Sequence, residues 1–113
     1  MPNRIEKVNS LLEHEISKII LRDFDFPKAI VTLTHIESTA NLIEAKVYIS
    51  SIPEKKSAKV VEKLNKGLYD IQQQINKKLN MRPIPRLRFV EDDNAKKAAR
   101  VEELLEKLKK EGK

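Results

Sequence analysis

A long amphipathic segment is interrupted by a glycine at its centre. Residues 59–79 place apolar side chains at steps of three and four, the spacing of one buried stripe along a helix. The middle of the segment holds Gly67, one of only two glycines in the chain. Because a glycine inside a helix costs about 1 kcal/mol relative to alanine, we expect one helix to end at residues 65–67 and a second to begin there. The stripe comprises Val60 or Val61, Leu64, Leu68, Ile71, Ile75 and Leu79.

A glycine break of this kind has two interpretations. It can let another backbone approach the bend closely, and the first-turn N–H groups of the second helix, with Lys66 and the Gly67 N–H beside them, could bind a phosphate. Alternatively, the bend is a corner between two helices that serves packing alone. The distribution of charge favours the first interpretation.

The formal net charge of +6 is concentrated around the broken helix. Residues 54–90 carry ten Lys or Arg against three Asp or Glu, whereas residues 1–53 carry six against seven and residues 91–113 carry seven against seven. Basic charge gathered in one segment is typical of a protein that binds a polyanion such as nucleic acid. A generally lysine-rich surface is the alternative.

Length and composition limit the class of protein. A chain of 113 residues fits a single domain, and we expect residues 1–113 to form one, ordered over about 4–108 with a frayed C-terminal tail. The absence of cysteine excludes disulfides and thiolate metal sites. No apolar run approaches the ~18 residues of a membrane-spanning helix, and the first residues show no apolar segment typical of a signal peptide. We therefore expect a soluble cytoplasmic protein.

Patterning along the chain predicts the order α-β-β-α-kink-α-β-α. Residues 4–22 form an amphipathic helix, residues 29–37 and 42–50 form an antiparallel hairpin, residues 86–90 form a third strand, and residues 94–110 form a last helix. The economical packing is an α+β architecture, with one three-stranded sheet covered by helices on one face.

Alternation assigns the faces of the predicted elements. Ala45, Val47 and Ile49 share the core face of the second strand, and Leu87 and Phe89 that of the third, so Arg86 and Arg88 point outward. In the first strand Ile36 breaks the alternation, which indicates a bulge near His35. In the first helix, which Asn3 and Glu6 could cap, the apolar stripe comprises Ile5, Val8, Leu11, Leu12, Ile16, Ile19 and Ile20.

The sequence offers little for catalysis. His14 and His35 have neither a cysteine partner nor metal-ligand spacing. Asp92 and Asp93 precede the last predicted helix, where acidic residues favour the helix dipole. There is no phosphate-cradling glycine run. We expect no catalytic residue, no metal, no cofactor and no enzymatic activity.

Four segments together resemble a known family. They are residues 31–37 (VTLTHIE), 44–50 (EAKVYIS), 85–89 (PRLRF) and 100–105 (RVEELL). In this order and spacing the chain resembles the ribosome-binding factor A family from about Arg4 to Leu108.

The resemblance implies a type II KH-like domain that binds small-subunit rRNA late in ribosome maturation. The family has an Ala-x-Gly kink in place of the GxxG loop of ordinary KH domains, and here Asn65-Lys66-Gly67 takes that position. Two further departures are Phe26-Pro27-Lys28, where the family tends to show Asp-Pro-Arg, and Arg86, where an acidic residue is common.

The candidate RNA-binding residues flank the kink and the third strand. They are Lys63, Asn65, Lys66, Gly67, Arg82, Arg86 and Arg88. Lysine and arginine side chains there can bind phosphates, arginine bidentately. With only three Phe, two Tyr and no Trp, we expect recognition of rRNA by backbone and shape and not by base stacking.

We therefore expect a monomeric, non-enzymatic factor that binds the small (30S) subunit through 16S rRNA and assists its late maturation and processing. No small-molecule substrate and no membrane are expected as partners. One alternative is a protein-binding adapter that docks its partner on the kinked helix pair. Another is a small DNA-binding regulator that uses the pair as a helix-turn-helix.

Overall fold

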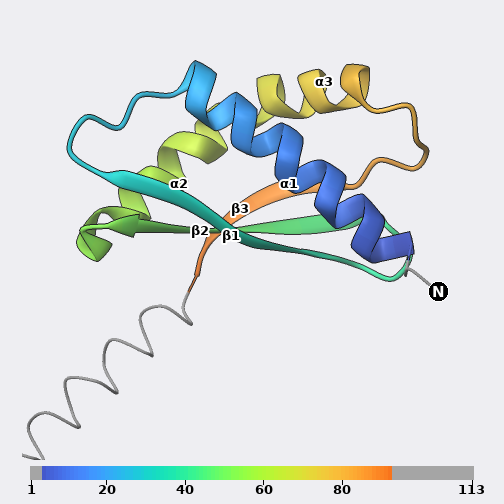
Figure 1. The fold of residues 1–113 in the computed structure, drawn as a ribbon, viewed down its shortest axis with the longest axis horizontal. Coiled ribbons are helices and arrows are strands. Elements are labelled where there is room, and N and C mark those ends of the chain that lie inside the picture. Colours follow the sequence, from blue (N-terminus) through green and yellow to red (C-terminus); the bar gives the residue numbers. More distant parts are fainter. Residues whose placement is uncertain (1–3, 93–113) are drawn as a thin grey trace, which may run out of the picture.

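The computed structural model describes residues 4–92, which form a sheet covered on one face by helices (Figure 1). Its elements are α1 (Arg4–Asp23), β1 (Ile30–Ser38), β2 (Glu44–Ile52), the short 3-10 helix η1 (Glu54–Lys56), α2 (Ser57–Lys66), α3 (Leu68–Lys78) and β3 (Arg86–Glu91). The predicted cap at Asn3, the last helix over residues 94–110 and the frayed tail lie outside the described residues.

The sheet has the order β1-β2-β3, with β1 and β2 antiparallel and β2 and β3 parallel. The parallel pair is possible because α2 and α3 form a crossover, which returns the chain to the end of the sheet where β2 begins. The β1–β2 register shifts between Leu33 and His35, which confirms the predicted bulge. The α+β class, the three strands and the one-sided helical cover are all as predicted.

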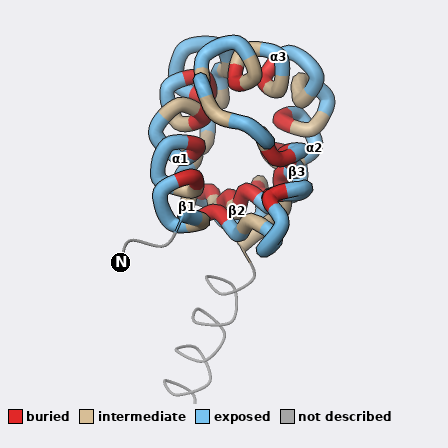
Figure 2. The backbone as a smooth tube through the Cα atoms, turned by 90° about the vertical axis from the view of Figure 1, so that its right-hand side faces the viewer, coloured by how far each residue is buried: buried red, intermediate tan, exposed pale blue. Residues whose placement is uncertain are grey.

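The core lies between the sheet and helices α1, α2 and α3 (Figure 2). The predicted faces of β2 and β3 are confirmed, and Phe89 is among the largest side chains that are fully buried. Core side chains of the described residues are Val8, Leu12, Ile16, Ile19, Ile20, Ile36, Leu42, Ala45, Val47, Ile49, Val60, Leu64, Ile71, Ile75, Leu87 and Phe89. Phe89 is the one aromatic residue among these buried side chains of residues 4–92, so the core is held mainly by close packing of aliphatic side chains.

Two details of the prediction are wrong. The apolar stripe of α1 includes Leu11 in the prediction, but this residue is 49% exposed because its neighbour Leu12 takes the position that faces the sheet. The second strand begins at Leu42 in the prediction, but this residue lies in the turn before Glu44, with a φ of 58°. Its side chain is nevertheless buried, so Leu42 is apolar because it fills the core beside the hairpin turn.

None of the helices within residues 4–92 is both long and apolar enough to cross a membrane.

Candidate nucleic-acid interface

The bend between α2 and α3 occurs at Gly67, as predicted. Its N–H donates to the carbonyl oxygens of Lys63 (3.3 Å) and Leu64 (3.1 Å), so it is not available to an anion. The Lys66 ammonium lies 3.3 Å from a carboxylate oxygen of Glu62, one helical turn earlier. The expected phosphate site made by Lys66 and the Gly67 N–H is therefore wrong, because helical hydrogen bonds already use the N–H.

A side chain, and not a backbone, approaches the bend closely. A Cβ atom at Gly67 would lie 2.8 Å from Cζ of Phe24, which is too close for an ordinary contact. The Phe24 ring in turn stacks on Phe26, with ring centroids 6.1 Å apart and planes 3° from parallel. The glycine therefore makes room for an aromatic pair from the segment that follows α1.

Two side-chain amides attach the bent helix pair to the free edge of β3. The Asn65 amide donates to the Phe89 carbonyl and accepts from the Phe89 N–H, both at 3.0 Å. The Gln72 amide accepts from the Leu87 N–H at 2.8 Å and donates to the Pro85 carbonyl at 3.1 Å. These amides satisfy edge groups that a further strand would otherwise pair, and they hold the bend beside β3.

A cavity of about 370 Å³, here called the β3 cavity, opens beside this attachment. It is lined by Glu44, Ala45, Lys46, Asn65, Leu68, Arg86, Leu87 and Arg88. Parallel pairing sets Glu44 opposite Arg86 and Lys46 opposite Arg88. The lining therefore carries three cations and one carboxylate, with two guanidinium groups able to hold phosphate oxygens bidentately.

The structure brings only some of the predicted residues together. Arg86, Arg88 and Asn65 line the β3 cavity. Lys63 lines another cavity with Phe26, and Gly67 lines a third, between α1 and α3. The backbone carbonyl of Arg82 accepts from Arg4 at the start of α1. The seven residues therefore do not form one continuous site around the bend.

Sequence reasoning missed Lys46 as a member of the β3 cavity. Alternation along β2 placed it opposite the core face, but only the parallel register brings it beside Arg88. All of residues 53–85 lie between the two strands in the chain, so no local signal could have shown this pairing.

The face of the sheet that no helix of residues 4–92 covers carries a polar cluster. His35 stacks on Tyr48 with ring centroids 4.1 Å apart, and the Tyr48 hydroxyl donates to Glu37 at 2.9 Å. Within residues 4–92 no group of three or more His, Cys, Asp or Glu side chains is arranged to hold a metal ion.

The fold and this site define a class of protein: a type II KH-like domain with a glycine bend between α2 and α3 and a basic cavity beside β3. The family model described as Ribosome-binding factor A matches residues 4–105, so the chain belongs to that family.

Individual comparisons agree with the family. A protein named Ribosome-binding factor A from Akkermansia muciniphila is 39% identical over 110 residues, which cover 97% of this chain and 88% of that protein. The crystal structure of ribosome-binding factor A from Thermus thermophilus superposes with a TM-score of 0.65 at 17% identity, covering 77% of this chain and 93% of that one.

A second structural comparison concerns a Thermus thermophilus homology model of the same factor, fitted into the cryo-EM map of a 30S–RbfA complex. It superposes with a TM-score of 0.63 at 17% identity, covering 75% of this chain and 91% of that one. At this level of identity both superpositions establish the shared fold.

Proposed function

We propose that this chain binds the small (30S) ribosomal subunit through 16S rRNA and assists the late maturation and processing of that subunit. Membership of the ribosome-binding factor A family over residues 4–105 carries the proposal. The fit of a similarly folded relative into a 30S complex supports the choice of partner. In this proposal the chain acts as a monomeric, single-domain factor in the cytoplasm.

The β3 cavity supplies the contact with RNA. Arg86, Arg88 and Lys46 line this one cavity and can bind successive phosphates of a folded rRNA segment. Asn65 acts there as a positioning residue, because its amide already pairs with the backbone of Phe89. Lys63, Lys66 and Arg82 contact the RNA outside this cavity, and Gly67 forms the bend between α2 and α3.

Binding alone accounts for an effect on maturation. A factor that binds one rRNA conformation more tightly than another shifts the equilibrium toward that conformation by the difference in affinity. No reacting group is required, and the chain acts as a non-enzymatic assembly factor.

Co-sedimentation with small subunits tests the proposal. The double variant Arg86→Glu/Arg88→Glu reverses two exposed cations of the β3 cavity, so we expect it to leave the small-subunit fraction while its circular dichroism stays unchanged. The control Lys7→Glu/Lys18→Glu makes the same change in charge on α1 and is expected to co-sediment normally. Equal retention of both variants would contradict the assignment.

A nuclease-treated pull-down separates this function from a protein-binding adapter. Association that depends on intact rRNA supports the proposal. A partner protein that stays bound after complete digestion of the RNA would favour the adapter.

A further inference from the structure

A second cavity, here called the loop cavity, lies between the segment that follows α1 and the start of α2. Its volume is about 480 Å³, within the roughly 300–1,000 Å³ of cavities that hold small organic groups. It shares no lining residue with the β3 cavity. It is lined by Asp25, Phe26, Pro27, Lys28, Ala29, Lys55, Lys56, Lys59, Val60 and Lys63.

One wall of the loop cavity is apolar and held in place. Phe26, Pro27, Ala29 and Val60 contribute to it, and Val60 is anchored in the core. The Phe26 ring stacks on Phe24, whose position against the α2–α3 bend requires a glycine there. The Lys63 ammonium lies over the Phe26 ring, 5.1 Å from its centroid. The wall is therefore preformed, and an apolar ring can contact the part of it beside the Lys63 ammonium at little cost in ordering.

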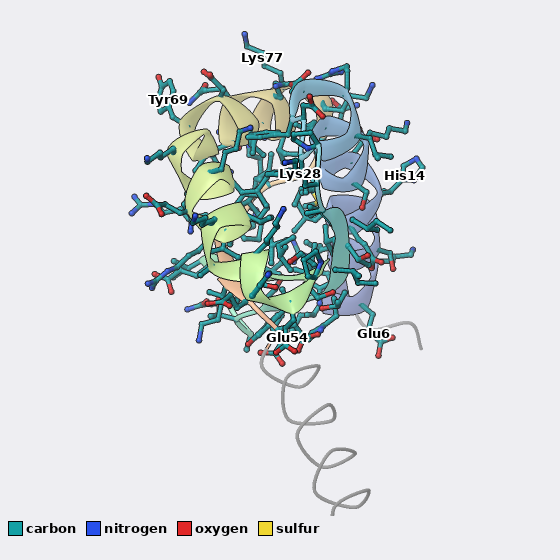
Figure 3. The ribbon with its side chains drawn as sticks, turned by 90° about the vertical axis from the view of Figure 1, so that its left-hand side faces the viewer. Glu6, His14, Lys28, Glu54, Tyr69 and Lys77 are labelled. Atoms are coloured by element: carbon teal, nitrogen blue, oxygen red, sulfur yellow. The ribbon has the colours of Figure 1, made fainter. Side chains whose placement is uncertain are left out.

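The rim of the same cavity is strongly basic. Five lysines and one aspartate line it. Two of the lysines tether the loop: Lys56 donates to the Lys28 carbonyl at 3.1 Å, and Lys63 donates to the Asp25 carbonyl at 3.0 Å. Each ammonium group has three donors, so a tether uses only part of its capacity. In Figure 3 Lys28 lies between α1 and α2.

An apolar wall with a cationic rim fits a ligand that has an aromatic ring and an attached anion. A nucleotide has both, because its base can lie against the apolar wall beside Lys63 and its phosphate can lie among the lysines. The basic residues also continue beyond the cavity: Lys59, Lys63 and Lys66 follow one another at helical spacing along α2. Such a row can contact the phosphates that flank a bound base, as in a continuous strand.

We propose that the loop cavity binds one unpaired nucleotide of an RNA strand, with its base against the Phe26–Val60 wall and its phosphates among the lysines of the rim. This rests on the proposed function, since the RNA would be part of the small subunit. The low aromatic content of the sequence predicts recognition of the RNA backbone without base stacking. A contact to one base is added here because the fold places the rings of Phe24 and Phe26 together.

The direct test is titration of the full chain with a short single-stranded oligoadenylate, followed by fluorescence of a 2-aminopurine placed within it. We expect Lys55→Gln/Lys59→Gln to weaken binding about tenfold or more, whereas the control Lys77→Gln/Lys78→Gln removes the same charge from α3, outside the loop cavity, and changes affinity much less. Figure 3 shows Lys77 projecting from α3, away from Lys28. Equal effects of the two variants would mean attraction by net charge alone and would overturn the proposal.

Phe26→Ala tests the base contact. We expect about a fivefold to hundredfold loss of oligoadenylate affinity and loss of the change in 2-aminopurine emission. Undiminished affinity in a variant shown by circular dichroism to be folded would overturn the proposal, and if the variant does not fold, the lysine pair decides. Adenosine monophosphate is titrated in parallel, and binding as tight as that of the oligonucleotide would assign the cavity to a free nucleotide instead of RNA.

The same variants distinguish this inference from the proposed function. If the wild-type chain co-sediments with small subunits but the loop-cavity variants bind oligoadenylate normally, only the inference fails. If the wild-type chain does not co-sediment, the proposed function fails, whatever the oligonucleotide shows.

Discussion

At the scale of single residues, Asn65 occupies a position where RNA contact was expected, yet its amide completes the edge of the sheet. Asn65→Ala would leave the N–H and carbonyl of Phe89 without their partners. We expect it to lower the free energy of unfolding by about 1–3 kcal/mol, measured by urea denaturation. The control Gln73→Ala changes an exposed residue of α3 and is expected to stay within about 0.5 kcal/mol of the wild type.

The opposite result would assign a different role to this residue. If Asn65→Ala left the unfolding free energy unchanged but reduced co-sedimentation with small subunits, Asn65 would be an RNA contact and not a positioning residue.

Replacing Gly67 by alanine is expected to change the stability of the chain in opposite directions when Phe24 is present and when it is removed. An alanine there gains helix propensity of up to about 1 kcal/mol, but its Cβ would lie 2.8 Å from the ring of Phe24. Because that ring is also stacked on Phe26, we expect Gly67→Ala to destabilise the chain by about 1–2 kcal/mol, an overpacking cost. In a Phe24→Ala background the same substitution is expected to be neutral or stabilising. Destabilisation of equal size in both backgrounds would show that the bend itself requires glycine.

At the scale of elements, a polar cluster joins the end of α1 to α3. Arg22 binds both carboxylate oxygens of Asp23, at 2.8 and 3.1 Å, and also donates to the Gln74 amide. The Gln74 amide donates to Asp23 at 3.0 Å. These contacts lower the pKa of Asp23 to about 2, with the hydrogen bond from Arg22 as the largest cause and that from Gln74 next.

This pKa predicts a specific dependence on pH. A carboxyl group whose pKa is lower in the folded state stabilises the fold above its unfolded pKa, near 4, and loses that contribution as the pH falls toward about 2. NMR titration of the Asp23 carboxyl carbon is expected to give a midpoint near 2, and Gln74→Ala should raise it. A wild-type midpoint near 4 would show that the cluster does not persist in solution.

At the scale of the whole molecule, the basic excess predicts binding that weakens with salt. Each phosphate contact releases counterions, so the affinity for small subunits should fall linearly with salt on logarithmic axes. We expect Arg86→Gln/Arg88→Gln to reduce that slope by about two, one for each lost contact. Lys7→Gln/Lys18→Gln is the matched control on α1, and a slope unchanged in both variants would place the phosphate contacts elsewhere.

Much of the architecture follows from the sequence by itself. The recurrence of apolar side chains every three or four residues located α1, α2 and α3. Alternation of apolar and polar residues located the core faces of β2 and β3. Even the bulge near His35 was visible as one break in that alternation. These features are local, because they depend on how each short segment divides its own side chains between core and solvent. Leu42 is an exception to this local pattern. It is buried like a strand residue but lies in a turn, and an apolar side chain in the sequence does not distinguish the two.

The arrangement of the site depended on tertiary structure. The parallel register placed Lys46 beside Arg88, the path of the chain after α1 placed Phe24 against Gly67, and the edge of β3 engaged the amide of Asn65. As a result, the basic residues predicted as one group lie around separate cavities. The physical reason is that these contacts join segments far apart in the chain, and a periodic pattern within one segment carries no information about which partner it will meet.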